Sequence, residues 1–334
     1  MINLRVVFTR RGEVAIEERP VPVPGPGEIL VETVCSLISP GTELTILRGD
    51  FPGNSRWADY AKFPFLPGYA NVGKVVELGE GVGREWKGKK IATYSPHSAF
   101  VTCPLESARM VTGDVSDEKA AFFSLAEICM NGVRRGVVTW GESVAVYGLG
   151  LLGQLTSRFC LLAGCSPVIG IDLNQFRVER LPCVKGCIGL NGTEDVKSRV
   201  AGFTDKRMAD VVFETTGNAG LIPDEFAVLK RQGRFVMLSS PSGPTPSFDF
   251  HDLCNSPSYT IIGAHNCSHP EHETPYNQWT RERHFRLFMD YLSDEKLDIK
   301  DLITHRIKPD DIPEMYRTLL SGAQDVLGVV IQWK

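Results

Sequence analysis

Residues 143–172 read SVAVYGLGLLGQLTSRFCLLAGCSPVIGID. A short β-type run, Val144–Tyr147, breaks into the glycine-rich GLGLLG, and an apolar helical pattern then continues to about Leu162. A second apolar run ends in Asp172. Strand, glycine turn, helix, strand and acidic tip is the order of a dinucleotide-binding βαβ unit. The sequence therefore predicts such a unit as the centre of the fold.

Each glycine of this turn has a separate expected task. Gly148 permits the tight turn, Gly150 lets a pyrophosphate approach the backbone, and Gly153 lets the helix pack closely on the strand. The helix would begin at Leu151 and Leu152, where free N–H groups and the helix dipole favour an anion. These five residues are predicted to bind the cofactor phosphates.

Asp172 lies 22 residues beyond Gly150, at the tip of the second strand. A carboxylate there can accept hydrogen bonds from both hydroxyls of an adenosine ribose, and its charge repels a 2′-phosphate. The sequence thus favours NAD, with NADP as the alternative.

Strand-like runs alternate with helical patterns from Val144 to Ala264, which predicts a doubly wound parallel sheet. Ligands bind at the carboxyl ends of such strands. We therefore assign further cofactor contacts to the residues that end the fourth and fifth runs: Thr215, Thr216, Gly217 and Ser239. The six runs are Val144–Tyr147, Val168–Ile171, Ile188–Leu190, Ala209–Phe213, Arg234–Leu238 and Tyr259–Ile262.

Residues 1–110 have a different character, with short strands broken by Gly/Pro turns, as in a small β-barrel-like domain. Met1–Phe8 and Val14–Glu18 are expected to form a hairpin, and residues 49–67 a long surface loop. Two helices, about 117–126 and 127–138, are expected before the glycine turn, and the tail after a helix at 279–293 returns to mixed α/β character.

Bulk composition excludes several classes of protein. The chain has 334 residues, 43% hydrophobic and 23% charged, with a net charge of −4. This balance gives no basic surface for nucleic acid, and no apolar run is long enough to span a bilayer. The N-terminus lacks the apolar block of a signal peptide. We expect a cytoplasmic protein with a small-molecule substrate and without nucleic-acid or membrane partners.

The nine cysteines are scattered, and most lie within apolar runs. Cys183 and Cys187 form the only close pair, and no second Cys or His pair follows at a spacing suited to structural zinc. Reduced, structural thiols are therefore expected.

The order of these parts resembles the medium-chain dehydrogenase/reductase superfamily, which is alcohol dehydrogenase-like. The resemblance rests on PGPGEILVE, PGYANVGKVVELGEGV, VAVYGLGLLG, DVVFETTG and GRFVMLSS, which occur in the right order. It implies an α/β protein with a GroES-like β-rich catalytic domain (1–122 and 267–334) around a doubly wound Rossmann domain (123–266). A nicotinamide cofactor would lie in the cleft between them, with Arg177, Ala264 and His265 among its contacts. A homodimer, paired along the strand Tyr259–Ile262, is implied as well.

The metal positions of the superfamily are altered in this chain. The zinc-binding cysteine is replaced by Pro40, the histidine by Tyr69, and the third ligand falls near Phe123. None of these is a good Zn²⁺ ligand, so we predict that no zinc is bound. The segments SPGTE, PGY and LITHR resemble a zinc-free branch that includes bacteriochlorophyllide dehydrogenase-like and threonine dehydrogenase-like proteins.

Without zinc, a side chain must supply the proton path for hydride transfer. Tyr69 occupies a metal-ligand position and could protonate or polarise a carbonyl oxygen, although it could equally fill the vacant volume. Thr42 matches the proton-relay hydroxyl of the superfamily and Glu43 the neighbouring acid; Glu43 could instead bond the backbone of its turn. His97 is a further candidate for lining the cleft.

The leading hypothesis is a zinc-independent, NAD-dependent oxidoreductase that interconverts a secondary alcohol, such as a polyol or sugar-like compound, and its ketone. The first alternative is an NAD(P)H-dependent quinone or enone C=C reductase, against which Asp172 counts. The second is a non-catalytic nucleotide-sensing protein that kept the fold, because a fold alone does not imply activity.

Overall fold

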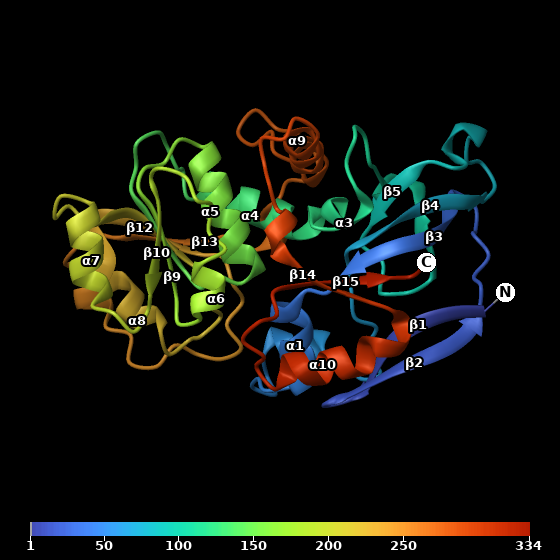
Figure 1. Cartoon of the computed structure of the whole chain (residues 1–334), viewed down its shortest axis with the longest axis horizontal. Helices are drawn as coiled ribbons and strands as arrows, with labels where there is room; N and C mark the ends of the chain where they lie inside the picture. Colours follow the sequence, from blue (N-terminus) through green and yellow to red (C-terminus); the bar gives the residue numbers. More distant parts are fainter. Residues whose placement is uncertain (1) are drawn as a thin grey trace. The chain divides into compact units, whose positions relative to one another are not determined.

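A computed structural model describes residues 2–334 of the chain (Figure 1). Met1, where the expected first strand and first domain begin, lies outside the described residues. The chain forms two compact units. The first runs to Ser124 and resumes as Phe285–Lys334, and the second comprises Leu125–His284.

The second unit is built on a six-stranded sheet in which all neighbouring strands are parallel. Its spatial order is β10-β9-β8-β11-β12-β13. Numbered from β8, this is 3-2-1-4-5-6, the order of a doubly wound dinucleotide-binding sheet, and it reverses between β8 and β11. The predicted fold class is therefore confirmed in this unit. The strands are β8 (Val144–Tyr147), β9 (Val168–Asp172), β10 (Cys187–Asn191), β11 (Ala209–Glu214), β12 (Leu229–Met237) and β13 (Thr260–Gly263).

Helices connect these strands, as parallel pairing requires. The central strands β8 and β9 are almost wholly buried, and α5 packs on both of them. The helices of this part of the chain are α4 (Phe123–Arg135), α5 (Leu151–Leu162), α6 (Gln175–Val178), α7 (Val196–Phe203) and α8 (Ile222–Glu225).

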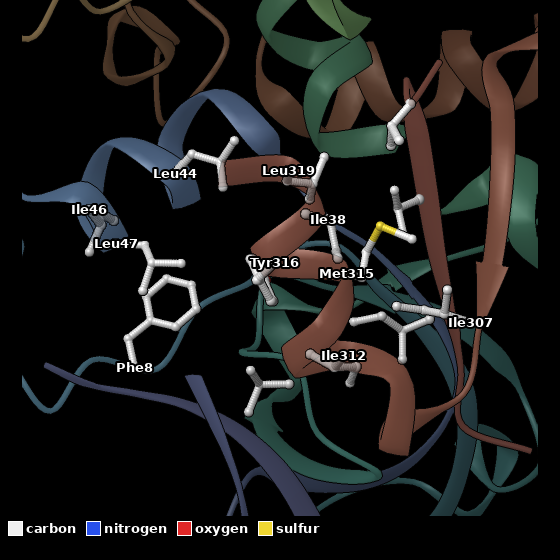
Figure 2. Close-up of a cluster of buried hydrophobic side chains, with 14 of the residues drawn as sticks. Phe8, Ile38, Leu44, Ile46, Leu47, Ile307, Ile312, Met315, Tyr316 and Leu319 are labelled. Carbon is white, nitrogen blue, oxygen red and sulfur yellow. The ribbon is translucent and has the colours of Figure 1, made fainter. Parts of the chain in front are cut away.

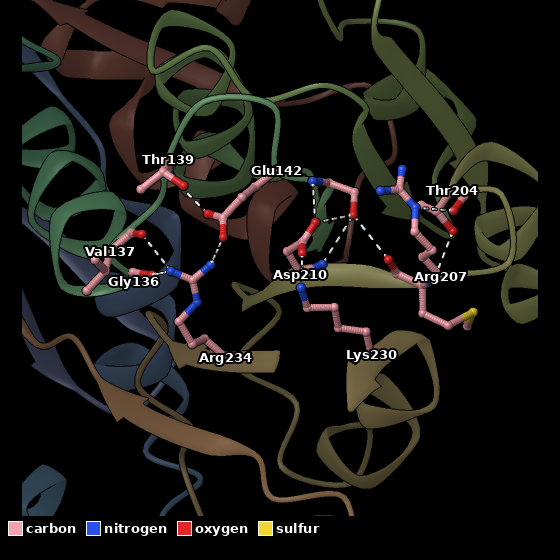
Figure 3. A network of polar contacts seen from close by, with 11 residues as sticks. Gly136, Val137, Thr139, Glu142, Thr204, Arg207, Asp210, Lys230 and Arg234 are labelled. Carbon is pink, nitrogen blue, oxygen red and sulfur yellow. Dashed lines mark hydrogen bonds and ion pairs between the residues drawn. The ribbon is translucent and has the colours of Figure 1, made fainter. Parts of the chain in front are cut away.

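Ionic side chains tie together the amino ends of the central strands (Figure 3). Arg234 pairs with Glu142 and also donates to the carbonyl oxygens that follow α4. Asp210 pairs with Lys230 and accepts from the N–H and hydroxyl of Ser143. The end of the sheet opposite the glycine turn is thus held by side-chain contacts, which leaves the carboxyl end for ligands.

The first unit contains the β-rich part of the chain. Strands β1 and β2 form the expected antiparallel hairpin, and a second sheet has the order β14-β15-β3-β4-β5-β7, with β6 also pairing with β3. Strand β15, from the C-terminus, pairs with β3, so the last segment of the chain does return to the first. The strands are β1 (Ile2–Arg10), β2 (Glu13–Pro20), β3 (Glu28–Leu37), β4 (Asn71–Leu78), β5 (Lys90–Thr93), β6 (Phe100–Pro104), β7 (Arg109–Met110), β14 (Ile303–Ile307) and β15 (Gly328–Gln332).

A core cluster of this unit lies where α1 meets α10 (Figure 2). Tyr316 of α10 is fully buried and makes an edge-on contact with Phe8 of β1 at 5.1 Å between ring centroids. Leu44 and Leu47 of α1 point into the same cluster. The helices of this part of the chain are α1 (Pro40–Arg48), α2 (Arg56–Tyr60), α3 (Asp117–Ala120), α9 (Arg281–Ser293) and α10 (Ile312–Leu320).

Some local expectations were wrong. Helix α2 lies inside the expected loop 49–67 and is begun by the side chain of Ser55. The helices expected at 117–126 and 127–138 are 117–120 and 123–135. A continuous helical pattern in the sequence does not show where one helix ends and the next begins. The cap geometry that fixes these ends is seen only in the structure.

Residues 267–284 lie in the compact unit of the glycine turn. Asn131 of α4 donates to Ser268 Oγ at 2.8 Å, and Arg134 of α4 donates to His284 Nε2 at 3.1 Å. Contacts of this kind attach the segment to α4. Among the described residues, no helix combines the length and apolar character needed to cross a bilayer.

Candidate active site

The glycine turn joins β8 to α5 at the point where the strand order reverses. Gly148 has a φ of 85°, which favours glycine, and a Cβ on it would lie 3.0 Å from the backbone nitrogen of Thr216. A Cβ on Gly153 would overlap the carbonyl oxygen of Gly148. Both positions therefore require glycine for reasons of backbone geometry.

Gly150 is different, because a Cβ there would meet no atom of the chain within 4 Å. It is also the N-cap residue of α5 and supplies no side chain to the first helical N–H groups, those that follow at Leu151 and Leu152. An open space beside uncapped N–H groups is what an anionic phosphate needs. The turn fits the pyrophosphate of a dinucleotide.

Asp172 lies beside this turn. Its Oδ2 accepts from the backbone N–H of Leu149 at 2.6 Å, and its Oδ1 accepts from the N–H of Asn174 at 2.8 Å. Arg177 approaches Oδ2 at 3.8 Å, and its buried Nε has no hydrogen-bond partner in the described chain. The carboxylate is held at a fixed angle, and an unused donor lies next to it, as a ribose site requires.

The predicted contacts after β11 and β12 meet around one buried carboxylate. Glu214 Oε1 accepts from the N–H groups of Thr216 and Gly217 and from the Thr216 hydroxyl, at 2.6 to 2.8 Å, and its Oε2 accepts from Ser239. Thr215 donates to the carbonyl oxygens of Tyr147 and Gly148. The side chains of Thr215 and Ser239 thus form hydrogen bonds at the strand ends. Glu214, which the sequence did not single out, accepts the bonds from Thr216, Gly217 and Ser239.

Ala264 and His265 follow the edge strand β13. Ala264 is buried and donates its N–H to the carbonyl of Met237. His265 is exposed, and its Nδ1 accepts from the N–H of Cys267 at 3.2 Å. Both lie at the carboxyl end of the sheet, which also carries the glycine turn.

Tyr69 lies in the first unit in a rare backbone conformation. Its φ is 140°, in a region that L side chains rarely adopt. The residue before it is Gly68, where a Cβ would lie 2.6 Å from the nitrogen of His97. The half-buried Tyr69 side chain directs its hydroxyl to Ser39 Oγ at 2.6 Å and Thr42 Oγ1 at 3.2 Å. Strain of this kind clusters at functional sites.

Burial is the main cause that raises the pKa of the Tyr69 phenol, and the nearby Glu43 carboxylate raises it further. The hydrogen bonds from Ser39 and Thr42 act in the opposite direction. The phenol is consequently neutral at physiological pH, and a neutral phenol is a hydrogen-bond donor and a weak acid.

Glu43 does not touch Tyr69. The Glu43 side chain is buried, and its Oε1 accepts from the N–H of Ser39 at 2.7 Å and from His97 Nε2 at 3.3 Å. Its Oε2 accepts from Tyr316. Glu43 does bond the backbone of its own turn, as in the structural alternative considered above, and whether it takes part in chemistry stays a prediction.

His97 is fully buried. Its Nδ1 lies 2.8 Å from Ser36 Oγ, and Ser36 Oγ accepts a hydrogen bond from Trp333 Nε1 at 2.9 Å. Since a carboxylate only accepts, the Nε2 that faces Glu43 carries a hydrogen. His97 therefore does not line a solvent-facing surface, and it links Glu43 to Ser36 of β3.

The positions of the three zinc ligands hold no donor set for a metal. Pro40 begins α1, the Tyr69 hydroxyl is bonded to Ser39 and Thr42, and Phe123 packs edge-on against the rings of Tyr94 and Phe285. Within residues 2–334, no three His, Cys, Asp or Glu side chains gather in a way that could hold a metal ion. The residues present do not fit zinc.

Comparison with known proteins finds similarity to dehydrogenases. The profile of the zinc-binding dehydrogenase family matches residues 152–281, a range that leaves out Pro40, Tyr69 and Phe123. The D-guloside 3-dehydrogenase of Escherichia coli K12 is 27% identical over 266 residues, which cover 78% of this chain and 75% of that protein.

Two solved structures superpose on almost the whole chain. A putative zinc-binding dehydrogenase from Sinorhizobium meliloti, bound to NADP, has a TM-score of 0.82 at 20% identity and covers 99% of both chains. An alcohol dehydrogenase from Escherichia coli CFT073, complexed with NADH, has a TM-score of 0.81 at 16% identity, covering 99% of this chain and 100% of that one. The fold is that of a dehydrogenase. Residues 152–281 thus match a dehydrogenase family, and the whole chain has the fold of the dehydrogenases with which it superposes.

Two parts of the site had no distinct signal in the sequence. Tyr316 is 273 residues from its partner Glu43, so only the fold brings them together. Ser39 was visible in the SPGTE segment, but a serine before a proline at a helix start is ordinarily interpreted as a cap.

Proposed function

We propose that this protein is a nicotinamide-dependent oxidoreductase that interconverts a secondary alcohol of polyol or sugar-like type and its ketone. The open, uncapped glycine turn at the reversal of the strand order is the observation that carries the proposal. The similarity to a D-guloside 3-dehydrogenase supports a sugar-like substrate. The NADP and NADH bound by the two structural neighbours support a nicotinamide cofactor.

NAD is the preferred cofactor in this proposal. The fixed carboxylate of Asp172 suits two ribose hydroxyls and opposes a 2′-phosphate. Arg177, whose Nε has no hydrogen-bond partner in the described chain, could still tolerate NADP.

Proton transfer is assigned to the Tyr69 hydroxyl, with Thr42 beside it. The glycine turn and Asp172 would hold a nicotinamide dinucleotide, which would supply the hydride donor or acceptor for the carbinol carbon. In reduction, the carbonyl oxygen becomes a hydroxyl by taking a proton from the phenol, which regains one through its hydroxyl neighbours. In oxidation the alcohol proton passes to the phenol oxygen as the phenol passes its own proton on to its hydroxyl neighbours. A neutral, hydrogen-bonded phenol suits this task, because a donor aimed at a developing alkoxide stabilises it.

Zinc independence is part of the proposal. It is supported by the proline, tyrosine and phenylalanine at the three ligand positions and by the hydrogen bonds that already occupy the Tyr69 hydroxyl. A Lewis acid is unnecessary if a side chain can polarise the carbonyl oxygen.

We also propose a cytoplasmic homodimer. Strand β13 is the edge of the parallel sheet, and Ile261 on it is 41% exposed. An apolar sheet edge is usually covered or paired, and pairing with a second copy would satisfy it. All nine cysteines are free thiols, which supports a reducing compartment.

The test begins with titration of the purified protein with NADH and NADPH, followed by a turnover screen with polyols, sugars, ketones and enones. NADH-dependent turnover of a secondary alcohol or ketone is expected. Turnover of enones with NADPH alone would favour the C=C reductase, and tight NADH binding without any turnover would favour the nucleotide sensor.

Two further measurements test the mechanism. Tyr69→Phe should lower kcat about 100-fold or more, in the range of general acid–base catalysis, while Tyr259→Phe, which removes a hydroxyl bonded to the Leu229 carbonyl, should not. Undiminished turnover of Tyr69→Phe would remove the phenol from the proton path. One stoichiometric zinc that supports activity would overturn the claim of zinc independence.

A further inference from the structure

Three helices of the first unit begin after a serine, and one of the three serines behaves differently. Ser55 accepts from the N–H of Ala58 at the start of α2, and Ser116 accepts from the N–H of Lys119 at the start of α3. These are ordinary N-caps. Ser39 is the N-cap residue of α1, yet its side chain makes no capping hydrogen bond.

The hydroxyl of Ser39 is directed to Tyr69 instead, with 2.6 Å between the two oxygens. The start of α1 is stabilised by its neighbours. Pro40 at the first helical position has no N–H to satisfy, and Glu43 accepts from the N–H of Ser39 at 2.7 Å. The Ser39 hydroxyl is therefore not needed to hold the helix.

The hydrogen bond between Tyr69 and Ser39 joins two residues whose positions are both restricted. The backbone of Tyr69 has a φ of 140°, and Gly68 leaves no room for a Cβ against the chain at His97. Ser39 is itself buried and anchored by its own N–H to Glu43. The contact thus joins two fixed groups, and such preorganisation is what proton transfer requires.

We propose that Ser39 is the positioning residue of Tyr69: its hydroxyl is diverted from helix capping to hold the phenol oxygen in place for proton transfer. The catalytic part of this proposal rests on the proposed function of Tyr69. A phenol oxygen has one hydrogen and two lone pairs, so partners at Ser39 and Thr42 leave a third direction for a substrate oxygen.

The first experiment requires no substrate. The protein is labelled with tyrosine carrying ¹³C at Cζ, and the Tyr69 signal is assigned from its loss in Tyr69→Phe. Ser39→Ala should shift this signal and raise the pH at which Tyr69 ionises, because a hydrogen bond that stabilises the phenolate is lost. Ser39→Thr, which keeps the hydroxyl, should restore both. Ser116→Ala is the matched control and should leave the Tyr69 signal in place.

Denaturation separates positioning from capping. Ser116→Ala should lower the unfolding midpoint, because a cap is lost, and Ser39→Ala should lower it less. An unchanged Tyr69 signal in Ser39→Ala, or an ionisation that Ser39→Thr does not restore, would overturn the proposal.

Turnover supplies the catalytic test once a substrate is known. Ser39→Ala should lower kcat about tenfold or more with little change in KM. It should also move the pH profile of kcat to higher pH. A rise in KM alone would contradict a positioning role. If Tyr69→Phe keeps full activity, the proposed function of Tyr69 fails, while the spectroscopic result still decides whether Ser39 holds the phenol.

Discussion

His97 Nε2 lies 3.3 Å from Glu43 Oε1, and both side chains are almost completely buried. The carboxylate also accepts from the N–H of Ser39 and the hydroxyl of Tyr316. One acidic side chain of α1 thereby joins the start of its own helix, the segment after β5 and helix α10. Because the Ser39 hydroxyl also forms a hydrogen bond with Tyr69, this buried cluster is connected through Ser39 to the candidate catalytic hydroxyl.

Removing the Glu43 carboxylate should be strongly destabilising. Glu43→Ala leaves three donors without their acceptor, and each buried unsatisfied donor costs about 1–3 kcal/mol, so we expect a loss of at least about 3 kcal/mol. Glu43→Gln should lose less, since its carbonyl oxygen still accepts. Urea denaturation measures both. The control Glu314→Gln removes a well-exposed ion pair with Arg317 and should change stability by less than about 0.5 kcal/mol. If Glu43→Gln and Glu314→Gln lost the same free energy of unfolding, the stabilising role of the buried cluster would be refuted.

Gly150 and Gly202 form a matched pair for testing the phosphate site. A Cβ on either glycine would meet no atom of the chain within 4 Å. Gly150→Ala should keep normal stability and weaken NADH binding about tenfold or more, because the new methyl group occupies the space of the pyrophosphate. Gly202→Ala, in α7, should leave binding unchanged. NADH fluorescence titration measures the affinity, and thermal denaturation measures the stability. Unaltered NADH binding by Gly150→Ala would argue against a phosphate site at the glycine turn.

Asp172→Asn should change the choice of cofactor. The amide keeps the shape and one acceptor oxygen but removes the negative charge that opposes a 2′-phosphate. We expect the ratio of NADPH to NADH affinity to rise about tenfold. Asp195→Asn is the control, because Asp195 caps α7 and asparagine caps a helix equally well. The ratio of NADPH to NADH affinity should stay unchanged in Asp195→Asn. If it also stayed unchanged in Asp172→Asn, another group would select the cofactor.

Glu225 makes the stability of the protein dependent on pH. It is fully buried, and neither carboxyl oxygen has a hydrogen-bond partner in the described part of the chain. Burial, followed by the charge of Glu214, raises its pKa from 4.5 to about 9. Between these two values the unfolded chain releases a proton that the folded chain retains, so stability falls as pH rises, by up to about 1.4 kcal/mol per pH unit.

Glu225→Gln should remove this dependence and stabilise the protein at pH 8, because a neutral side chain has no proton to lose on unfolding. Urea denaturation at pH 5, 7 and 9 gives the slope directly. The exposed Glu179 serves as control, since Glu179→Gln should leave the slope unchanged. Identical slopes in wild type and Glu225→Gln would show that Glu225 does not titrate in this range.

The sequence by itself was sufficient to predict the βαβ unit. Its information is local: strand, three glycines, helix and acid follow one another within 30 residues. Gly148 and Gly153 answer constraints of the adjacent backbone, and Gly150 leaves the space beside the helix start open. The doubly wound parallel sheet that this stretch predicted is confirmed, and residues 152–281 match a dehydrogenase family. The proline, tyrosine and phenylalanine at Pro40, Tyr69 and Phe123, where the resemblance places zinc ligands, can also be identified from the sequence, and zinc independence stays a prediction.

Only the tertiary structure decided what surrounds Tyr69. The partners of Glu43 come from positions 97 and 316, and the contact of Tyr69 with Ser39 spans 30 residues. Local patterns carry no information on such contacts, because they depend on how the strands and helices pack. The same reason applies to Glu214 and Glu225, whose burial results from the layers around them. A serine that should cap a helix, and instead binds a tyrosine, is recognised only when both are seen in the fold.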